Sequence, residues 1–145
     1  MRNSRAVSAI ERAVEIAKTK GVKRAMLLAV SAPFHCALMQ PAADVMAQAL
    51  AQVSIKPPLV PVVANVLAKP ISEPAEIVAA LIAQVTGTVR WRESVAFMVD
   101  AGVTAFYELG AGKVLAGLTK RIAAGASASA IGSPEDVAAF KAARA

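Results

Sequence analysis

The sequence predicts an α/β fold with a largely parallel sheet. Apolar segments of strand length alternate along the chain with segments whose apolar residues recur at helical spacing. The chain has 145 residues, enough for one domain with a sizeable core. Its hydrophobic content of 57% is high for this length, which indicates elements buried on both faces and a missing packing partner.

The first half alternates two helices and two strands before a third helix. Residues 4–20 are predicted to form an amphipathic helix ended by Gly21, followed by a buried strand over 25–30. Residues 37–53 are predicted as the second helix, with Pro41 in its first turns. The β-branched segment 59–64 predicts another buried strand. Residues 70–74 read as a loop that starts the third helix with Ser72 as its N-cap, and residues 86–88 interrupt that helix.

The second half continues the alternation. We expect a fourth helix over 89–101 that ends at Gly102, and a clear strand over 103–109. The glycine-rich residues 110–112 lead into a fifth helix over 113–123, and the small, weakly apolar segment 126–131 predicts an edge strand. Residues 133–136 (SPED) are a strong helix start, because serine caps, proline suits the first turn and acids favour the helix dipole.

His35, the only histidine, is the first candidate for chemistry. It lies between the strand predicted over 25–30 and the helix predicted over 37–53, so it is expected at the carboxyl end of a strand, where open α/β sheets bind ligands. Imidazole titrates near neutral pH and can serve as a general base. A turn histidine satisfied by backbone groups is the alternative interpretation.

Composition narrows the possible partners. The net charge of +6 favours an acidic partner, and a phosphorylated cofactor or an acidic carrier protein would serve as well as nucleic acid. Few aromatic residues and scattered basic ones argue against nucleic acid. The longest uncharged stretch, 25–43, contains two prolines and a histidine, so no membrane span is expected. The single Cys36 excludes an internal disulfide and fits a reducing, cytoplasmic setting, and no metal constellation is present.

Four motifs in order resemble the C-terminal half of malonyl-CoA:acyl carrier protein transacylases. They are residues 31–39 (SAPFHCALM), 61–65 (PVVAN), 89–91 (VRW) and 110–115 (GAGKVL). The resemblance covers nearly the whole chain. It implies that residues 1–30 are the tail of a small ferredoxin-like subdomain and that residues 31–145 are the C-terminal part of a hydrolase-like, parallel-sheet large subdomain.

The resemblance also implies a reaction. A malonyl group would pass from malonyl-CoA to the phosphopantetheine thiol of acyl carrier protein in fatty acid biosynthesis, by a ping-pong route through an acyl-serine and without a cofactor. His35 would be the general base, and the backbone carbonyl of Gln84, at the end of the third predicted helix, would orient it. The side chain of Gln84 could equally face solvent. The family's G-x-S-x-G elbow is absent from this sequence, so the serine nucleophile would lie in a missing N-terminal half.

Other candidate residues have both functional and ordinary interpretations. Phe34 resembles the aromatic residue that precedes the histidine in malonyl-selective acyltransferases, or it is part of the core. Asn65 could line the substrate pocket or cap its own turn. Cys36 is a rival nucleophile, but adjacent side chains diverge, and a small buried hydrophobe is the ordinary interpretation. Residues 110–113 could cradle a phosphate, although close backbone packing is favoured.

Three functional hypotheses follow. The first is an S-malonyltransferase half that is inactive alone, either in fatty acid synthesis or as the acyltransferase segment of a polyketide synthase. The second is a non-catalytic remnant that binds a carrier protein. The third, an independent hydrolase that uses Cys36 or an unrecognised serine, is disfavoured because no nucleophile elbow occurs.

Overall fold

The computed structural model describes residues 4–27 and 32–144 and divides the chain into two compact units, Met1–Phe34 and His35–Ala145. The first unit contains α1 (Ser4–Thr19), so the helix predicted over residues 4–20 is confirmed. The helix is followed closely by Gly21, whose φ of 80° favours glycine. Residues 25–27 of the predicted first strand have no regular structure, and its remainder lies outside the described residues. The predicted boundary between the two subdomains, at residue 30, also lies outside the described residues.

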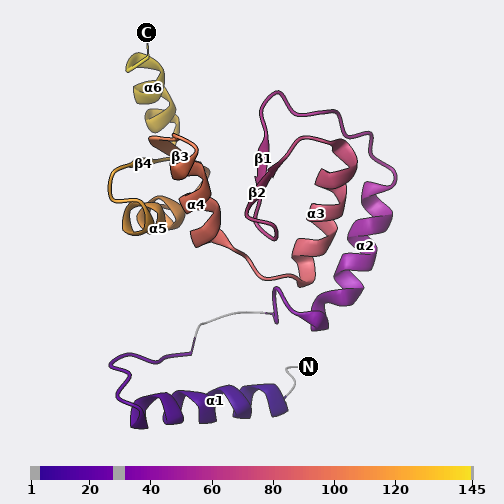
Figure 1. Cartoon of the computed structure of the whole chain (residues 1–145), viewed down its shortest axis with the longest axis vertical. Helices are drawn as coiled ribbons and strands as arrows, with labels where there is room; N and C mark the ends of the chain where they lie inside the picture. Colours follow the sequence, from indigo (N-terminus) through magenta and orange to yellow (C-terminus); the bar gives the residue numbers. More distant parts are fainter. Residues whose placement is uncertain (1–3, 28–31, 145) are drawn as a thin grey trace. The chain divides into compact units, whose positions relative to one another are not determined.

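The second unit begins with a helical layer. A short 3-10 helix, η1 (Ala37–Met39), leads into α2 (Gln40–Leu50), where the sequence predicts one helix over 37–53. Pro41 lies in the first turn of α2, where the missing N–H costs nothing. Ala43 is buried and α2 packs against α3 (Pro74–Thr86), beside which it lies in Figure 1.

The segment before α3 corrects two predictions. Val62–Ala64 (β1) and Lys69–Ile71 (β2) form an antiparallel hairpin, with Val62 opposite Ile71 and Ala64 opposite Lys69. The predicted loop over 70–74 therefore begins inside a strand, and the sheet is not largely parallel, because one of the two small sheets is antiparallel. Pro70 is tolerated in β2 because this strand has an unpaired edge, where no N–H is needed.

Helices α3 and α4 (Trp91–Asp100) follow the predicted pattern except at one cap. Ser72 is not the N-cap of α3; Glu73 occupies that position without a side-chain hydrogen bond, and Pro74 starts the helix. Gly102, with φ of 91°, follows α4 as predicted. The innermost side chains of the described residues include Ser94 and Val95 of α4, which are 1% and 0% exposed.

The last part is a β–α–β–α unit. Ala105–Leu109 (β3) and Ser127–Ile131 (β4) pair in parallel, with Ala105 opposite Ser127, and α5 (Val114–Ile122) packs on both strands and on α4. The sixth helix, α6 (Pro134–Ala142), begins with the predicted cap, since Ser133 and Asp136 form a reciprocal capping box. The fold class is thus α/β, built from helices and two small sheets (Figure 1).

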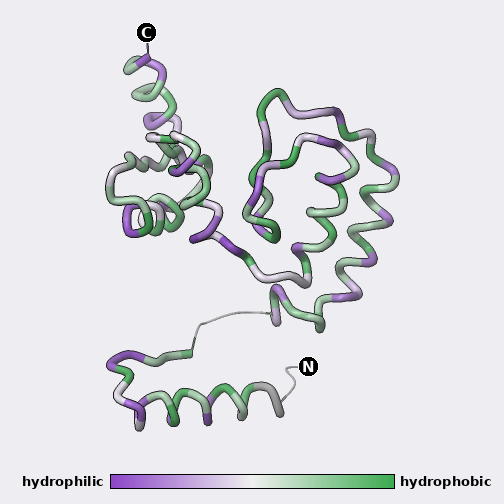
Figure 2. Tube along the Cα trace, in the orientation of Figure 1, coloured by the Kyte–Doolittle hydropathy of each residue, from purple (hydrophilic) through white to green (hydrophobic). Residues whose placement is uncertain are grey.

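Apolar residues are spread along all elements rather than gathered in one core segment (Figure 2). Many large ones are solvent-exposed, among them Leu59, Leu109 and Val114. No helix among the described residues is long and apolar enough to cross a membrane. The same residues hold no cluster of three metal-ligating side chains.

Candidate active site around His35

His35 occupies a turn with unusual backbone geometry. Its φ is 58°, in the left-handed region that non-glycine residues seldom adopt, although histidine is among those enriched there. The turn is followed directly by Cys36, the N-cap of η1, and by α2. Backbone strain of this kind is concentrated at functional sites, where the surrounding structure enforces it. The imidazole itself is exposed.

The structure brings His35 and Gln84 together. Nδ1 of His35 lies 2.9 Å from the backbone carbonyl oxygen of Gln84, 49 residues away in the chain. A carbonyl oxygen can only accept, so Nδ1 must carry the proton in this bond. In the neutral ring the lone pair is then on Nε2, the atom that can accept a proton.

The carbonyl of Gln84 can accept a hydrogen bond from His35 because α3 ends two residues later, at Thr86. Gly87 follows the helix, and its N–H bonds to the carbonyl of Ala83 at 2.9 Å. Gly87 then turns to an extended backbone, with φ −85° and ψ 157°, so the helical donor for the next carbonyl, that of Gln84, is lost. His35 supplies the replacement donor.

Gly87 has no room for a side chain. A Cβ at this position would lie 2.8 Å from the carbonyl oxygen of Ala83 and 2.8 Å from Cγ2 of Val66. The end of α3 is therefore in direct contact with the turn that joins β1 to β2. The sequence predicts an interruption at residues 86–88, but the need for glycine at residue 87 comes from Val66, which is distant in sequence.

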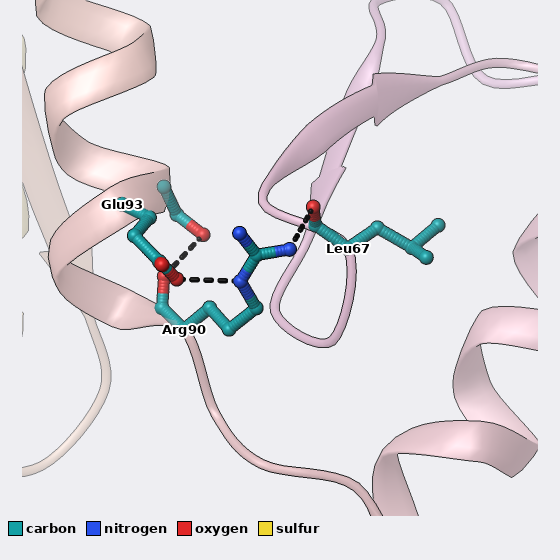
Figure 3. Close-up of polar contacts among 4 residues, drawn as sticks. Leu67, Arg90 and Glu93 are labelled. Atoms are coloured by element: carbon teal, nitrogen blue, oxygen red, sulfur yellow. Dashed lines mark hydrogen bonds and ion pairs between the residues drawn. The ribbon is translucent and has the colours of Figure 1, made fainter.

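Asn65 begins that turn and is tied to the start of α4. Its backbone carbonyl accepts the N–H of Arg90 at 2.9 Å, and Nη1 of Arg90 donates to the carbonyl of Leu67 at 3.0 Å (Figure 3). Ala68 completes the turn with a left-handed φ of 53°. Asn65 is half-buried, and among the described residues the structure records no hydrogen bond between it and His35.

Arg90 also forms an exposed ion pair with Glu93, its neighbour on the same side of α4 (Figure 3). The hydrogen bond and charge of Glu93 raise the pKa of Arg90. The hydrogen bond from Arg90 lowers the pKa of Glu93 in turn. Because both groups are exposed, this pair orients the guanidinium toward Leu67 more than it stabilises the fold.

Phe34 and Cys36 flank the histidine in sequence. Phe34 is the last residue of the first unit, and its side chain is 55% exposed, so it is not a core residue within the described structure. Cys36 is half-buried, forms no disulfide and has an extended backbone at the N-cap of η1. In this segment it is His35 whose side chain bonds to the backbone carbonyl of Gln84.

The helix start that follows the glycine-rich loop 110–113 is already bonded by a side chain of the same chain. Gly110 and Gly112 both have positive φ, and the carboxylate of Glu108 accepts the N–H groups of Leu115 and Ala116 at 3.1 and 2.8 Å. An acid already fills the anion-binding end of α5, which disfavours a phosphate there. Sequence reasoning missed Glu108, because a side chain that bonds an N–H group seven residues further along, that of Leu115, has no local signature.

The chain is similar over nearly its whole length to proteins of one kind. No family model matches it. It is 48% identical over 131 residues to the malonyl CoA-acyl carrier protein transacylase of Escherichia coli K12, which covers 90% of this chain and 42% of that protein. A crystal structure of acyl-carrier-protein-S-malonyltransferase from Bartonella henselae matches with a TM-score of 0.85 and 49% identity, over 94% of this chain and 43% of that one. The predicted resemblance is confirmed.

A third match concerns a complex. A malonyl-transacylase solved together with a type II polyketide synthase acyl-carrier protein is 43% identical to this chain, with a TM-score of 0.82 and coverage of 93% and 43%. In all three comparisons the chain spans less than half the length of the malonyl transacylase relative. The similarity therefore reaches the C-terminal part of these relatives, the part that carries the His35 motif in this sequence.

Proposed function

We propose that this chain is the base-bearing part of an S-malonyltransferase that moves malonyl from coenzyme A to the thiol of acyl carrier protein. The hydrogen bond between Nδ1 of His35 and the carbonyl of Gln84 carries the proposal, because it leaves Nε2 as a proton acceptor. The similarity to malonyl transacylases supplies the substrate class. The basic chain, with net charge +6, suits acidic partners.

The proposed reaction uses His35 twice. Nε2 takes the proton of a serine hydroxyl as the oxygen attacks the thioester carbonyl of malonyl-CoA, and the imidazolium returns a proton to the departing thiolate of coenzyme A. Nε2 then takes the proton of the carrier's phosphopantetheine thiol, whose sulfur attacks the malonyl ester, and the serine oxygen regains a proton. The carbonyl of Gln84 would hold the Nδ1 proton throughout.

The serine belongs, in this proposal, to the part of the malonyltransferase that this chain does not span, so the chain alone is inactive. Phe34 and Asn65 are proposed to contact the malonyl group. Residues 1–30 and 31–145 are proposed to be the ends of a ferredoxin-like and a hydrolase-like subdomain, in a cytoplasmic enzyme of fatty acid synthesis. A polyketide role is a second candidate, since one relative was solved with a polyketide carrier protein.

The test is malonyl transfer with radiolabelled malonyl-CoA and acyl carrier protein. The chain is assayed alone and with the segment of the Bartonella henselae enzyme that lies outside its match to this chain. His35→Asn should lower transfer by the assembled pair at least about 100-fold, because the general base is lost. Asparagine tolerates the left-handed backbone of His35, so this variant tests the imidazole rather than the turn.

Gln84→Ala is the matched control, because it removes the side chain and keeps the carbonyl that contacts His35. It should retain transfer close to that of the unchanged chain. Acid-stable label on the chain alone that requires His35 would show a nucleophile within these residues and refute the half-enzyme proposal. Full activity of His35→Asn in the assembled pair would refute His35 as the general base, and no transfer by the assembled pair would leave the carrier-binding remnant as the better hypothesis.

A further inference from the structure

Arg90 is bonded through both its backbone and its side chain where α4 begins. Its N–H donates to the carbonyl of Asn65 at 2.9 Å, and its Nη1 donates to the carbonyl of Leu67 at 3.0 Å. Its own carbonyl accepts the N–H and the Oγ–H of Ser94, each at 2.9 Å. Nε donates to the carboxylate of Glu93 (Figure 3). One residue therefore ties the turn between β1 and β2 to the first turn of α4.

Burial fixes the α4 end of this connection. Ser94 and the adjacent Val95 are 1% and 0% exposed, so the first turn of α4 cannot move without disturbing closely packed side chains. The guanidinium of Arg90 is exposed and adds little to the free energy of folding. It is planar and has acceptors on two separate segments, Glu93 and Leu67, so its contribution is geometric: it fixes the turn relative to α4.

The turn that Arg90 holds is in contact with the helix end beside His35. Val66 belongs to this turn, and its Cγ2 lies so close to Gly87 that a Cβ on Gly87 would be 2.8 Å from it. Gly87 follows α3 and leaves the carbonyl of Gln84 to Nδ1 of His35, 2.9 Å away. A displacement of the turn would therefore reach Gln84 through one side-chain contact and three residues of chain.

We propose that Arg90 is a positioning residue for His35. By holding the turn of residues 65–68, it keeps the end of α3 in place, and with it the carbonyl of Gln84 that fixes the imidazole ring. The inference rests on the proposed function, in which His35 with a protonated Nδ1 is the general base. Because Arg90 acts through the turn rather than on the substrate, its loss should lower kcat more than it raises KM.

The first test observes the neutral ring in the chain alone. His35 is the only histidine, so its imidazole ¹⁵N resonances report its tautomer directly. Arg90→Ala should move the ring from the Nδ1–H form toward a mixture of tautomers, because the carbonyl of Gln84 is no longer held in place. Arg92→Ala removes the same charge two residues later and leaves the bond to Leu67 intact, so the spectrum should not change. Equal spectra of the two variants would overturn the proposal.

Two further variants test the connection and protect the experiment if Arg90→Ala does not fold. Glu93→Ala keeps Arg90 but releases its guanidinium from α4, and should shift the ring in the same direction by a smaller amount. Val66→Ala removes the side chain that touches Gly87 and should shift the ring by itself. Adding Arg90→Ala to it should then change little more, because both act through the same contact. Additive shifts, or an unshifted ring in Glu93→Ala and Val66→Ala, would overturn the proposal.

Malonyl transfer by the pair assembled with the segment of the Bartonella henselae enzyme is a separate readout. Arg90→Ala should lower kcat about tenfold and leave the KM for malonyl-CoA within about twofold, whereas Arg92→Ala should change neither. A lower urea midpoint of Arg90→Ala with an unchanged ring and an unchanged kcat would show a purely structural role and overturn the inference.

The two readouts also separate this inference from the proposed function. A pair that transfers no malonyl, in which the ring still responds to Arg90→Ala, would refute the proposed function and leave the positioning of His35 by Arg90 standing. Transfer that requires His35, with a ring and a kcat that do not respond to Arg90→Ala, would support the proposed function and refute the positioning role.

Discussion

The two halves of the second unit satisfy their helix ends in different ways. In residues 35–90 the open carbonyl at the end of α3, that of Gln84, is bonded by His35 from 49 residues away. In residues 91–145 the start of α6 is bonded by Ser133 and Asp136, within the same turn. A local cap stabilises its helix, and a short sequence pattern is enough to specify it. A long-range partner at a helix end instead creates a defined site, at the cost of depending on the packing around it.

The largest loss of stability should come from disturbing the end of α3, where His35 makes its long-range bond. Gly87→Ala places a methyl 2.8 Å from Ala83 O and Val66 Cγ2, so the end of α3 must shift. We expect a loss of about 1–3 kcal/mol in the free energy of unfolding, measured in urea. Gly117→Ala, in the middle of α5 with open space around it, is the matched control and should stabilise by about 0.5–1 kcal/mol.

The same variant tests the site directly. Because His35 is the only histidine, imidazole ¹⁵N spectra report on this ring alone. The unchanged chain should show the Nδ1–H tautomer, and Gly87→Ala should move the ring toward a mixture of tautomers as the carbonyl of Gln84 moves away. An unaltered spectrum in Gly87→Ala would mean that the His35 contact does not depend on where α3 ends.

Disturbing the local cap of α6 should cause an intermediate loss of stability. Ser133→Ala removes the side-chain acceptor for the N–H of Asp136 at the start of α6. The free energy of unfolding should fall by about 1 kcal/mol, the usual value for a lost N-cap. The His35 ring spectrum should not change. A shifted spectrum would show that the two halves are coupled and would break the comparison.

The capping box should also respond to pH in a predictable direction. The N–H groups of Gly132 and Ser133 lower the pKa of Asp136 below its usual range. A carboxyl with a depressed pKa in the folded state stabilises the fold above its unfolded pKa of about 3.9, and this contribution is lost as the pH falls through the folded value. The stability difference between the unchanged chain and Asp136→Asn should therefore shrink between neutral pH and acid. A difference that is constant with pH would contradict the assignment.

The smallest effect on stability is expected at Arg90. Its side chain is exposed, so Arg90→Ala should lower the urea midpoint less than Ser133→Ala does. The turn held by its bond to Leu67 should nevertheless open more often, which would be seen as faster hydrogen exchange at the N–H of Ala68. Arg92→Ala is the neighbouring control, and equal exchange in both variants would show that the guanidinium does not hold the turn.

The sequence predicted the local features well, because their causes are local. Gly21, Gly102 and the SPED start of α6 mark helix ends through backbone freedom and side-chain caps that act within a few residues. Strand β4 was also found, although its residues are small. His35, Gln84, Phe34 and Asn65 were singled out through the family resemblance, and their roles stay predictions.

The failures lie in the hairpin and have a physical reason. The loop predicted over 70–74 begins with Pro70, but β2 contains this proline at an unpaired edge. The turn of residues 65–68 lacks the Asn-Gly or Asp-Gly signature of a hairpin. Its left-handed position is occupied by Ala68, where glycine would be expected. Arg90, which bonds to Leu67, and Gly87, which lies against Val66, are remote in sequence from this turn, so no local pattern could reveal the antiparallel pairing.

The exposed apolar side chains also bear on how this protein can accumulate in a cell. Residues such as Leu59 and Leu109, which in the described structure face solvent, are the kind of surface that chaperones retain and proteases remove. A chain produced in excess over whatever covers that surface would be short-lived. If the proposed function holds, its abundance would then follow the supply of the serine-bearing part, so the ratio of the two parts would be held near equality by degradation rather than by matched synthesis.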